Sequence, residues 1–274
     1  MGVSVERIKT GIQGFDELIE GGIPKGFNVL VVGLPGAGKT IFGLEYLYNG
    51  AINGEHGIYV SLDSTLETLK EQALQFGWDL DKLEKEGSIK LLKVPLDKLK
   101  VNLFDMIEEE SKEIGAMRLV FDSLASFEVN IDQFAIPLAY MPGIASRPAE
   151  GTTVAKRDKQ YRYEIMPISG EDPKGRIFYK GISEKRITYL TINELSKLGT
   201  TNFIITDALE NGVHLSVDGV SEYVCDSVIR LHAVEGEELN TLNIVKMRYT
   251  NVKRGIYNFR FDKEGIVLNT LDVK

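Results

Sequence analysis

One stretch decides how the rest of this chain is interpreted: Gly33-Leu34-Pro35-Gly36-Ala37-Gly38-Lys39-Thr40. It fits the pattern G-x-x-x-x-G-K-[ST]. An apolar run over residues 27–32 leads into it, and a helical pattern begins at Ile41. A strand, a glycine-rich loop and a helix in this order are the setting in which the pattern marks a phosphate-binding loop. We therefore predict that this stretch binds the phosphates of a nucleotide; the alternative is a chance glycine-rich turn before a lysine.

Each residue type in this loop has a physical role. Glycines let the backbone form a nest whose N–H groups point at phosphate oxygens, and the following helix adds the positive end of its dipole. Lys39 would reach the β- and γ-phosphates, and the Thr40 hydroxyl would bind Mg²⁺. The predicted nucleotide-binding residues are Gly33, Leu34, Pro35, Gly36, Ala37, Gly38, Lys39, Thr40 and Ile41.

Composition limits the other possibilities. The chain has 274 residues, 43% of them hydrophobic, a formal charge of −8 and one cysteine. This predicts one α/β domain over residues 1–274 and excludes an intrachain disulfide or a multi-cysteine metal site. No apolar run reaches the length of a membrane span, and residues 1–7 lack the apolar core of a signal peptide. We expect a cytoplasmic protein without a membrane segment.

A second candidate ligand for the metal lies at the end of a later strand. The buried-type run Met117–Leu124 contains Asp122-Ser123, the form in which a Walker B strand ends. Asp122 would hold Mg²⁺ opposite Thr40. Strand ends often carry aspartate, so the run alone is a weak signal. Together with the phosphate-binding loop it predicts a metal site made by Thr40 and Asp122.

The segment before the loop, residues 7–26, carries a further pattern, T-G-x-x-G-x-D-x-L, followed by G-G and P-x-G. The matching residues are Thr10, Gly11, Gly14, Asp16, Leu18, Gly21, Gly22, Pro24 and Gly26. With the loop, this segment resembles the KaiC/RadA group of the RecA-like ATPases. The resemblance covers residues 7–124 and 183–262. It implies a single-domain, archaeal-type KaiC-like ATPase whose cofactors are ATP and Mg²⁺, and it places residues 202–207 as the family's sensor strand.

In RecA-like ATPases the general base follows the strand expected here at residues 57–62. KaiC proteins have two consecutive glutamates there, whereas this chain has Asp63 and Ser64. Asp63 can polarise the attacking water. Its side chain is one methylene shorter than glutamate, about 1.5 Å, and a misplacement of that size can cost about 100-fold in rate. We therefore predict slow hydrolysis. The alternative role of Asp63 is to cap the helix that follows.

A pair of cations lies on the strand expected at residues 242–250. Lys246 and Arg248 alternate onto one face of that strand. In KaiC-like rings a Lys-x-Arg at this place reaches the γ-phosphate of the neighbouring subunit, and cations supplied in this way can be worth about 10³–10⁵ in rate. The alternative is an ordinary solvated strand face. Val252 stands where the family often has histidine.

Residues 126–182 form a segment that the family pattern lacks, inserted after the Walker B strand. Within it, residues 160–181 read as a β-hairpin. Between Arg147 and Lys180, eight basic residues stand against five acidic ones, a balance of +3, with tyrosine and phenylalanine interleaved. Such a surface could contact nucleic acid or a protein partner through residues 145–180. The alternative is a packed or mobile insertion, which the small charge bias favours.

These observations predict a RecA-like α/β fold: a mostly parallel core sheet flanked by helices, an inserted β-hairpin segment and C-terminal β-hairpins. The implied function is ATP binding with slow Mg²⁺-dependent hydrolysis, coupled to partner binding or to assembly of a hexameric ring of identical chains. Two alternatives are a non-hydrolysing ATP-binding switch, which Asp63 and Ser64 favour, and a recombinase-like DNA-binding ATPase, which the basic aromatic hairpin favours. The predicted catalytic residues are Lys39, Asp63, Lys246 and Arg248.

Overall fold

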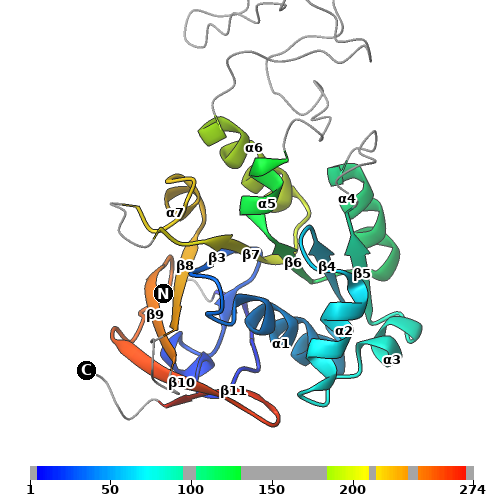
Figure 1. The fold of residues 1–274 in the computed structure, drawn as a ribbon, viewed down its shortest axis with the longest axis horizontal. Coiled ribbons are helices and arrows are strands. Elements are labelled where there is room, and N and C mark those ends of the chain that lie inside the picture. Colours follow the sequence, from blue (N-terminus) through cyan, green and yellow to red (C-terminus); the bar gives the residue numbers. More distant parts are fainter. Residues whose placement is uncertain (1–4, 95–102, 131–183, 210–213, 234–239, 270–274) are drawn as a thin grey trace, which may run out of the picture.

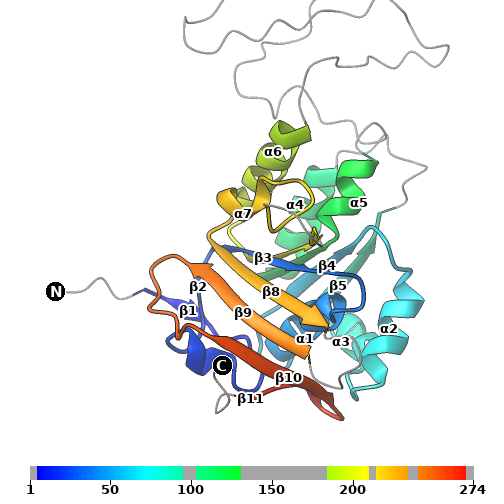
Figure 2. The same ribbon diagram turned by 60° about the vertical axis from the view of Figure 1, so that its left-hand side comes forward.

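The computed structural model describes residues 5–94, 103–130, 184–209, 214–233 and 240–269. In these ranges the main element is a nine-stranded sheet with the order β11-β10-β9-β8-β3-β7-β6-β4-β5 (Figure 1). The strands from β8 to β5 run parallel. Strands β9, β10 and β11 continue the sheet in antiparallel fashion along one side (Figure 2). The predicted parallel core sheet with flanking helices and C-terminal antiparallel strands is confirmed.

The elements follow one another in an alternating pattern. The strands of the main sheet are β3 (Asn28–Gly33), β4 (Gly57–Ser61), β5 (Ile89–Lys93), β6 (Arg118–Asp122), β7 (Thr201–Asp207), β8 (Ser227–Ala233), β9 (Asn240–Met247), β10 (Ile256–Asp262) and β11 (Gly265–Asn269). Two short strands, β1 (Arg7–Ile8) and β2 (Ile23–Pro24), pair separately. The helices are α1 (Lys39–Ile52), α2 (Leu66–Leu74), α3 (Leu80–Lys85), α4 (Leu103–Ile114), α5 (Leu124–Val129), α6 (Glu184–Lys197) and α7 (Ser221–Val224), with a 3-10 turn at Asp16–Leu18.

The core sheet is buried on both faces. Helices α1, α2 and α3 cover one face, and α4, α5 and α6 cover the other (Figure 1). Because side chains alternate along a strand, Val29 and Val31 belong to the first core, and Leu30 and Val32 to the second. Strands buried on both faces read as continuous apolar runs. This is why residues 27–32 show no alternation of polar and apolar side chains.

Capping residues set several boundaries that differ from the sequence-based expectation. The strand expected over residues 117–124 ends at Asp122, because Ser123 begins a helix: its Oγ accepts a hydrogen bond from Ser126 N at 3.2 Å. Thr65 caps α2 in the same way, accepting from Thr68 N. Asp79 caps α3, a helix that the sequence analysis missed, by accepting from Lys82 N.

The segment predicted as an insertion is only partly within the described residues. Residues 126–129 belong to α5. Residues 131–182, which include the expected hairpin at 160–181 and the basic stretch at 145–180, lie outside the described ranges. No helix in the described ranges is both long and apolar enough to cross a membrane.

Side-chain hydrogen bonds explain the pattern in the segment before the phosphate-binding loop. Asp16 Oδ1 accepts from the Thr10 backbone N at 2.9 Å and from Thr10 Oγ1 at 2.8 Å, and Asp16 Oδ2 accepts from Gly11 N at 3.1 Å. Gly11 adopts φ +73°, and a Cβ there would lie 2.8 Å from Asn49 of α1. The threonine, glycine and aspartate of the pattern thus hold this segment against the helix that follows the loop.

The C-terminal hairpin β10–β11 lies against the same loop and helix. A Cβ on Gly38 would come within 2.4 Å of the Phe261 ring, so this ring lies directly on the loop. Glu45 of α1 is only 4% exposed, and its Oε2 accepts from Ile266 N of β11 at 2.8 Å. Burial raises the pKa of Glu45 to about 8, although the hydrogen bond from Ile266 opposes the shift. A buried acid therefore ties the hairpin to the helix.

The raised pKa of Glu45 predicts a pH dependence of stability. Between the ordinary carboxyl pKa of 4.5 and about 8, the folded chain keeps a proton on Glu45 that the unfolded chain releases. The free energy of unfolding therefore falls as pH rises through this window, by at most about 1.4 kcal/mol per pH unit, and the fall stops above it. The Glu45→Gln variant, whose amide oxygen can still accept from Ile266, should lack this fall.

Urea unfolding of both proteins between about pH 5 and pH 9 measures the effect. The glutamine variant should gain stability relative to the wild type as pH rises. Glu67→Gln, in the exposed first turn of α2, is the matched control and should follow the wild-type curve. Parallel curves for wild type and Glu45→Gln would show that Glu45 is already ionised in the folded protein.

Candidate nucleotide and metal site

The carboxyl ends of the parallel strands meet at one edge of the sheet, and the predicted site residues of the loop and of β4 and β6 lie there. Gly33 ends β3 and is in register with Asp207, which ends β7. Asp122 ends β6 and is in register with Ser61, two residues before Asp63. In open α/β sheets ligands bind at this edge. Segments far apart in sequence are therefore brought to one place.

The phosphate-binding loop has the backbone that the motif requires. Gly36 and Gly38 adopt φ values of +81° and +87°, which favour glycine. Helix α1 begins directly after Gly38, at Lys39, two residues earlier than the helical pattern indicated. Lys39 Nζ donates to Gly33 O at 2.7 Å and Leu34 O at 3.0 Å. The lysine therefore curls over its own loop, beside the N-terminal end of α1.

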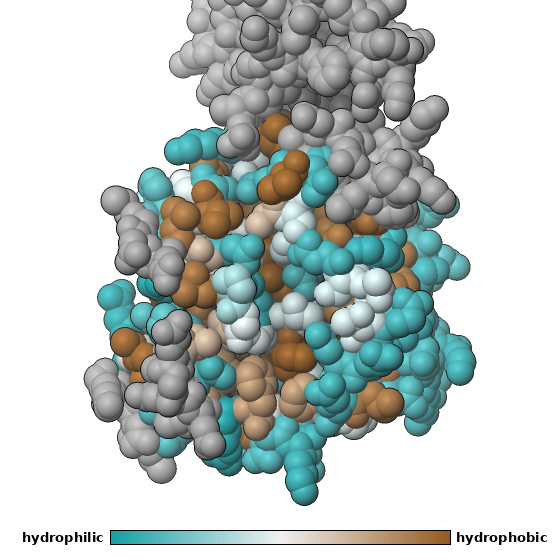
Figure 3. Space-filling view, in the orientation of Figure 1, coloured by the Kyte–Doolittle hydropathy of each residue, from teal (hydrophilic) through white to brown (hydrophobic). Residues whose placement is uncertain are grey.

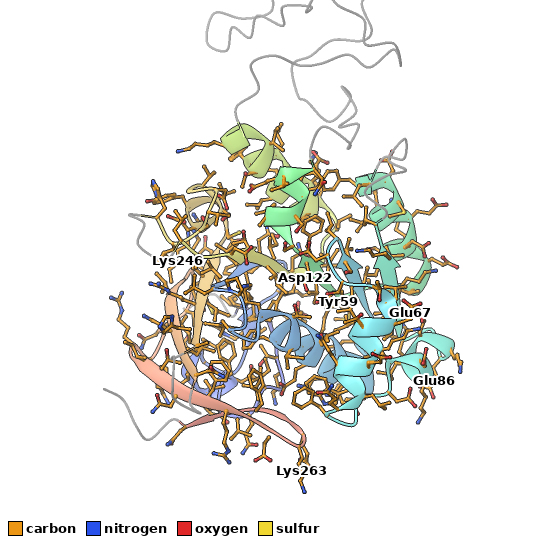
Figure 4. The ribbon with its side chains drawn as sticks, viewed as in Figure 1. Tyr59, Glu67, Glu86, Asp122, Lys246 and Lys263 are labelled. Carbon is orange, nitrogen blue, oxygen red and sulfur yellow. The ribbon has the colours of Figure 1, made fainter. Side chains whose placement is uncertain are left out.

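The two predicted metal ligands lie together. Thr40 Oγ1 donates to Asp122 Oδ2 at 2.9 Å, although 82 positions separate them in the sequence. The hydroxyl of Tyr59, from β4, donates to the same oxygen at 2.6 Å. Figure 4 shows Tyr59, from the middle of β4, close to Asp122 at the end of β6. Burial raises the pKa of Asp122, and the hydrogen bonds from Tyr59 and Thr40 oppose that shift.

This donor set fits a magnesium–nucleotide complex. Magnesium prefers a few hard oxygen ligands together with phosphate oxygens and water. The Thr40 hydroxyl and the Asp122 carboxylate, in contact with each other, are such ligands. The loop amides, the helix N-terminus and Lys39 supply the positive potential that phosphates need. Residues 33–41, Thr40 and Asp122 are thus compatible with the role that the sequence predicts for them.

Asp63 lies at the edge of this site. Ser123 Oγ donates to its Oδ2 at 2.8 Å, and Ser126 Oγ donates to its Oδ1. Both hydroxyls come from the start of α5. The side chain of Asp63 is exposed. Thr65, and not Asp63, caps α2, so the capping alternative for Asp63 is wrong. The carboxylate instead joins the end of β4 to α5.

Three polar residues of the site were not predicted from the sequence. Tyr59 donates a hydrogen bond from its hydroxyl to Asp122 Oδ2. Lys93, the last residue of β5, donates to Leu62 O at 2.8 Å; burial lowers its pKa, and the charges of Asp63 and Asp122 oppose this. Asp207 forms an ion pair with Lys39 at 3.0 Å. The sequence offers one indication of a site role for Lys93 and Asp207, their position at or next to the ends of expected strands. Many residues with a purely structural role also lie at strand ends, so this position does not identify a site residue.

Lys246 and Arg248 lie apart from the loop of their own chain. Lys246 pairs with Val228 of β8, which is level with Leu30 of β3, three residues before Gly33. That corresponds to about 10 Å along the strand, and Figure 4 shows Lys246 well away from Asp122. Lys246 Nζ donates to Tyr223 O at 3.4 Å, and Arg248 pairs with Asp226 at 2.9 Å. The structure of one chain does not bring these cations to the Lys39 site.

The hydropathy of the molecular surface differs between the flank of the molecule and its centre. In Figure 3 the flank formed by α2 and α3 is largely hydrophilic. Apolar residues are visible nearer the centre of the same view.

Within the described ranges, no group of three or more histidine, cysteine, aspartate or glutamate residues could hold a metal ion. The candidate metal ligands in the described part of the chain are Thr40 and Asp122.

Comparison with known proteins agrees with this geometry. A sequence model of a protein family described as KaiC ATPase matches residues 8–135 and 184–272. The crystal structure of a KaiC-like protein from the hyperthermophilic archaeon Pyrococcus horikoshii superimposes with a TM-score of 0.70 at 30% identity, over 97% of this chain and 100% of that one. Fold and family pattern thus point to the same group of proteins.

Curated relatives of two lengths also match. The circadian clock oscillator protein KaiC of Synechococcus elongatus is 29% identical over 267 residues, which are 96% of this chain and 44% of that protein. A UPF0273 protein of Aeropyrum pernix is 27% identical over 282 residues, with 96% of this chain and 94% of the relative covered. The chain therefore spans less than half of the clock protein and nearly all of the shorter relative.

Proposed function

The chain belongs to the KaiC family of ATPases, and we propose that it binds ATP with Mg²⁺ and hydrolyses it slowly within a ring of identical chains. The observation that carries this proposal is the contact between Thr40 Oγ1 and Asp122 Oδ2 beside the loop that Lys39 covers. Phosphate groups and a hard cation are the ligands that this combination of a glycine nest, a lysine, a hydroxyl and a carboxylate recognises.

Each residue of the site has a separate role in the proposed phosphoryl transfer. The loop amides and Lys39 hold and orient the phosphates, while Thr40 and Asp122 hold the metal. The metal that these two residues would hold would supply positive charge to the phosphate oxygens. Asp63 accepts the proton of the attacking water. Tyr59 keeps Asp122 oriented by donating a hydrogen bond of 2.6 Å.

Lys246 and Arg248 act on the nucleotide of a neighbouring chain in this proposal. Their separation from the Lys39 site of their own chain supports a role across an interface. The side chain of Arg248 is 54% exposed despite its ion pair with Asp226, so a neighbour can reach it. Hydrolysis would then require assembly, which links turnover to the formation of a hexameric ring or to a partner that stabilises one.

The main alternative is an ATP-binding switch that assembles without turning over ATP. One observation favours it: both carboxylate oxygens of Asp63 already accept hydroxyl hydrogen bonds from Ser123 and Ser126. An attacking water would have to share these carboxylate oxygens with the two hydroxyl donors or displace one of them. Ser64, next to it, has no carboxylate to take over. The recombinase-like alternative depends on residues 145–180, outside the described ranges.

We expect purified protein to release phosphate from Mg·ATP. Lys39→Ala should abolish both nucleotide binding and phosphate release, because it removes the cation that holds the phosphates. Asp63→Asn should keep nucleotide affinity and lower phosphate release by about 100-fold or more, in keeping with the loss of a general base. Phosphate assays, nucleotide titrations and size-exclusion chromatography with and without nucleotide measure these effects.

The same measurements separate the alternatives. Nucleotide binding and nucleotide-dependent assembly with equal, negligible phosphate release from wild type and Asp63→Asn would establish the switch. Undiminished hydrolysis in Asp63→Asn would remove Asp63 from the mechanism while leaving the ATPase activity. Turnover that DNA stimulates, and that falls steeply as salt rises, would favour the recombinase-like function.

Mixing two inactive variants tests the role of the cations across the interface. The Lys39→Ala variant retains Lys246 and Arg248. The Lys246→Ala/Arg248→Ala variant retains the phosphate-binding loop with Lys39. Each alone should be inactive, and an equimolar mixture should recover about a quarter of the wild-type rate per site, because a working site needs a loop from one variant beside cations from the other. Dilution to monomers should abolish turnover of the wild type.

Lys253→Ala/Arg254→Ala is the matched control, since both residues are exposed on the loop that follows β9. This double variant should keep wild-type activity by itself. If Lys246→Ala/Arg248→Ala were fully active alone, or if the mixture stayed inactive although mixed rings formed, the proposed contribution across the interface would be wrong.

A further inference from the structure

We infer that Asp207 is a specificity-determining residue of this site, which holds Lys39 when no nucleotide is bound and disfavours the triphosphate more than the diphosphate. The inference rests on the proposed nucleotide site and deepens it. Asp207 ends β7 and lies in register with Gly33, the first residue of the loop. Its carboxylate Oδ1 is 3.0 Å from Lys39 Nζ.

The position of Asp207 follows from the strand on which it lies. Side chains alternate along β7, and Phe203 and Ile205 belong to the core on the α1 side of the sheet. Asp207, two residues further, is therefore directed to that side, where Lys39 begins α1. The backbone secures this position: Ala208 N donates to Gly33 O at 3.1 Å, and Val217 N donates to Asp207 O at 3.1 Å. The backbone at Asp207 is thus held next to the loop by two neighbouring segments.

A count of hydrogen bonds shows why Asp207 competes with phosphate. A lysine ammonium group has three N–H donors. Lys39 directs them to Gly33 O at 2.7 Å, Leu34 O at 3.0 Å and Asp207 Oδ1 at 3.0 Å. A phosphate oxygen that binds Lys39 must therefore displace at least one of these acceptors. The two carbonyls belong to the loop backbone, whereas the Asp207 side chain is 43% exposed and can turn towards water.

The same geometry separates ATP from ADP. Two oxygens that each contact one ammonium nitrogen at about 3 Å can be no more than about 6 Å apart. A γ-phosphate on Lys39 would therefore lie close to the Asp207 carboxylate, and like charges at that separation repel. Lys39 would reach both the β- and the γ-phosphate, so a triphosphate brings one phosphate group more to this lysine than a diphosphate does. Asp207 consequently opposes both nucleotides, and it opposes the triphosphate more strongly because the triphosphate carries the larger negative charge.

The test replaces Asp207 with asparagine, which keeps the shape and removes the charge. Asp207→Asn should bind Mg·ATP about fivefold more tightly than wild type and Mg·ADP no more than about twofold more tightly, as expected for loss of a partly exposed ion pair. Calorimetric titration measures both affinities. In the absence of nucleotide the variant should be slightly less stable, because Lys39 loses a partner. Affinity and stability therefore change in opposite directions, which a general structural defect would not produce.

Asp81→Asn is the matched control. Asp81 also forms an exposed ion pair, with Lys70 at 2.7 Å, but on α3. It should leave both nucleotide affinities unchanged. Unchanged or weakened ATP affinity in Asp207→Asn, or an equal gain for both nucleotides, would overturn the inference.

A second comparison needs no nucleotide. In urea unfolding of wild type, Asp207→Asn, Lys39→Met and the double variant, the effect of Asp207→Asn should disappear once Lys39 is absent. We expect a coupling of about twofold to fivefold in the unfolding equilibrium constant. A coupling of zero would overturn the contact itself. Failure of wild type to bind either nucleotide would instead overturn the proposed function, and this cycle would then decide whether Asp207 holds Lys39.

Discussion

The hydrogen bond from Thr40 Oγ1 to Asp122 Oδ2, 2.9 Å long, joins the loop after β3 to the end of β6, and the rest of the site depends on it. Asp122 is 5% exposed, and a buried carboxylate needs partners to offset its lost hydration. Helix α1 must cross the sheet closely for Thr40 to reach it. Gly43 permits this approach, because a Cβ there would lie 2.9 Å from the Val120 side chain of β6. The close packing of α1 on β6 and the contact between Thr40 and Asp122 therefore depend on the same feature, the lack of a side chain at Gly43.

Two lysines at this edge of the sheet, Lys39 and Lys93, are held by acceptors of the chain itself. Lys39 binds two carbonyls and Asp207, and Lys93 binds Leu62 O. Asp63 is likewise held, by Ser123 and Ser126. A ligand that binds such a site must replace hydrogen bonds that these side chains already make within the chain. Affinity is then a difference between two sets of hydrogen bonds, which makes a residue outside the motif, such as Asp207, a means of tuning it.

The chain departs from its family pattern at Asp63 and Ser64, the proposed position of the general base, and keeps the pattern in the phosphate-binding loop. The candidate binding residues lie in one chain, at the ends of β3 and β6. The candidate cations, Lys246 and Arg248, lie on β9 and just beyond its end, towards the opposite end of β3 from the loop. In the proposed function, this division places recognition within one chain and the control of turnover between chains. Assembly would then govern hydrolysis without any change in the phosphate-binding loop.

The amino-acid sequence is enough to predict those parts of the protein that depend on residues close together in the chain. The phosphate-binding loop, its strand and helix, and the Thr10–Asp16 segment follow from short patterns, because glycine torsions and local hydrogen bonds act over a few positions. Asp122 was predicted because its strand has a familiar form. Only the folded chain shows that Tyr59 donates to Asp122, that Lys93 donates to Leu62 O and that Asp207 pairs with Lys39. The physical reason is that a parallel sheet brings distant strand ends to one edge, and the order of the strands, which is set by packing of the whole core, decides which ends are neighbours.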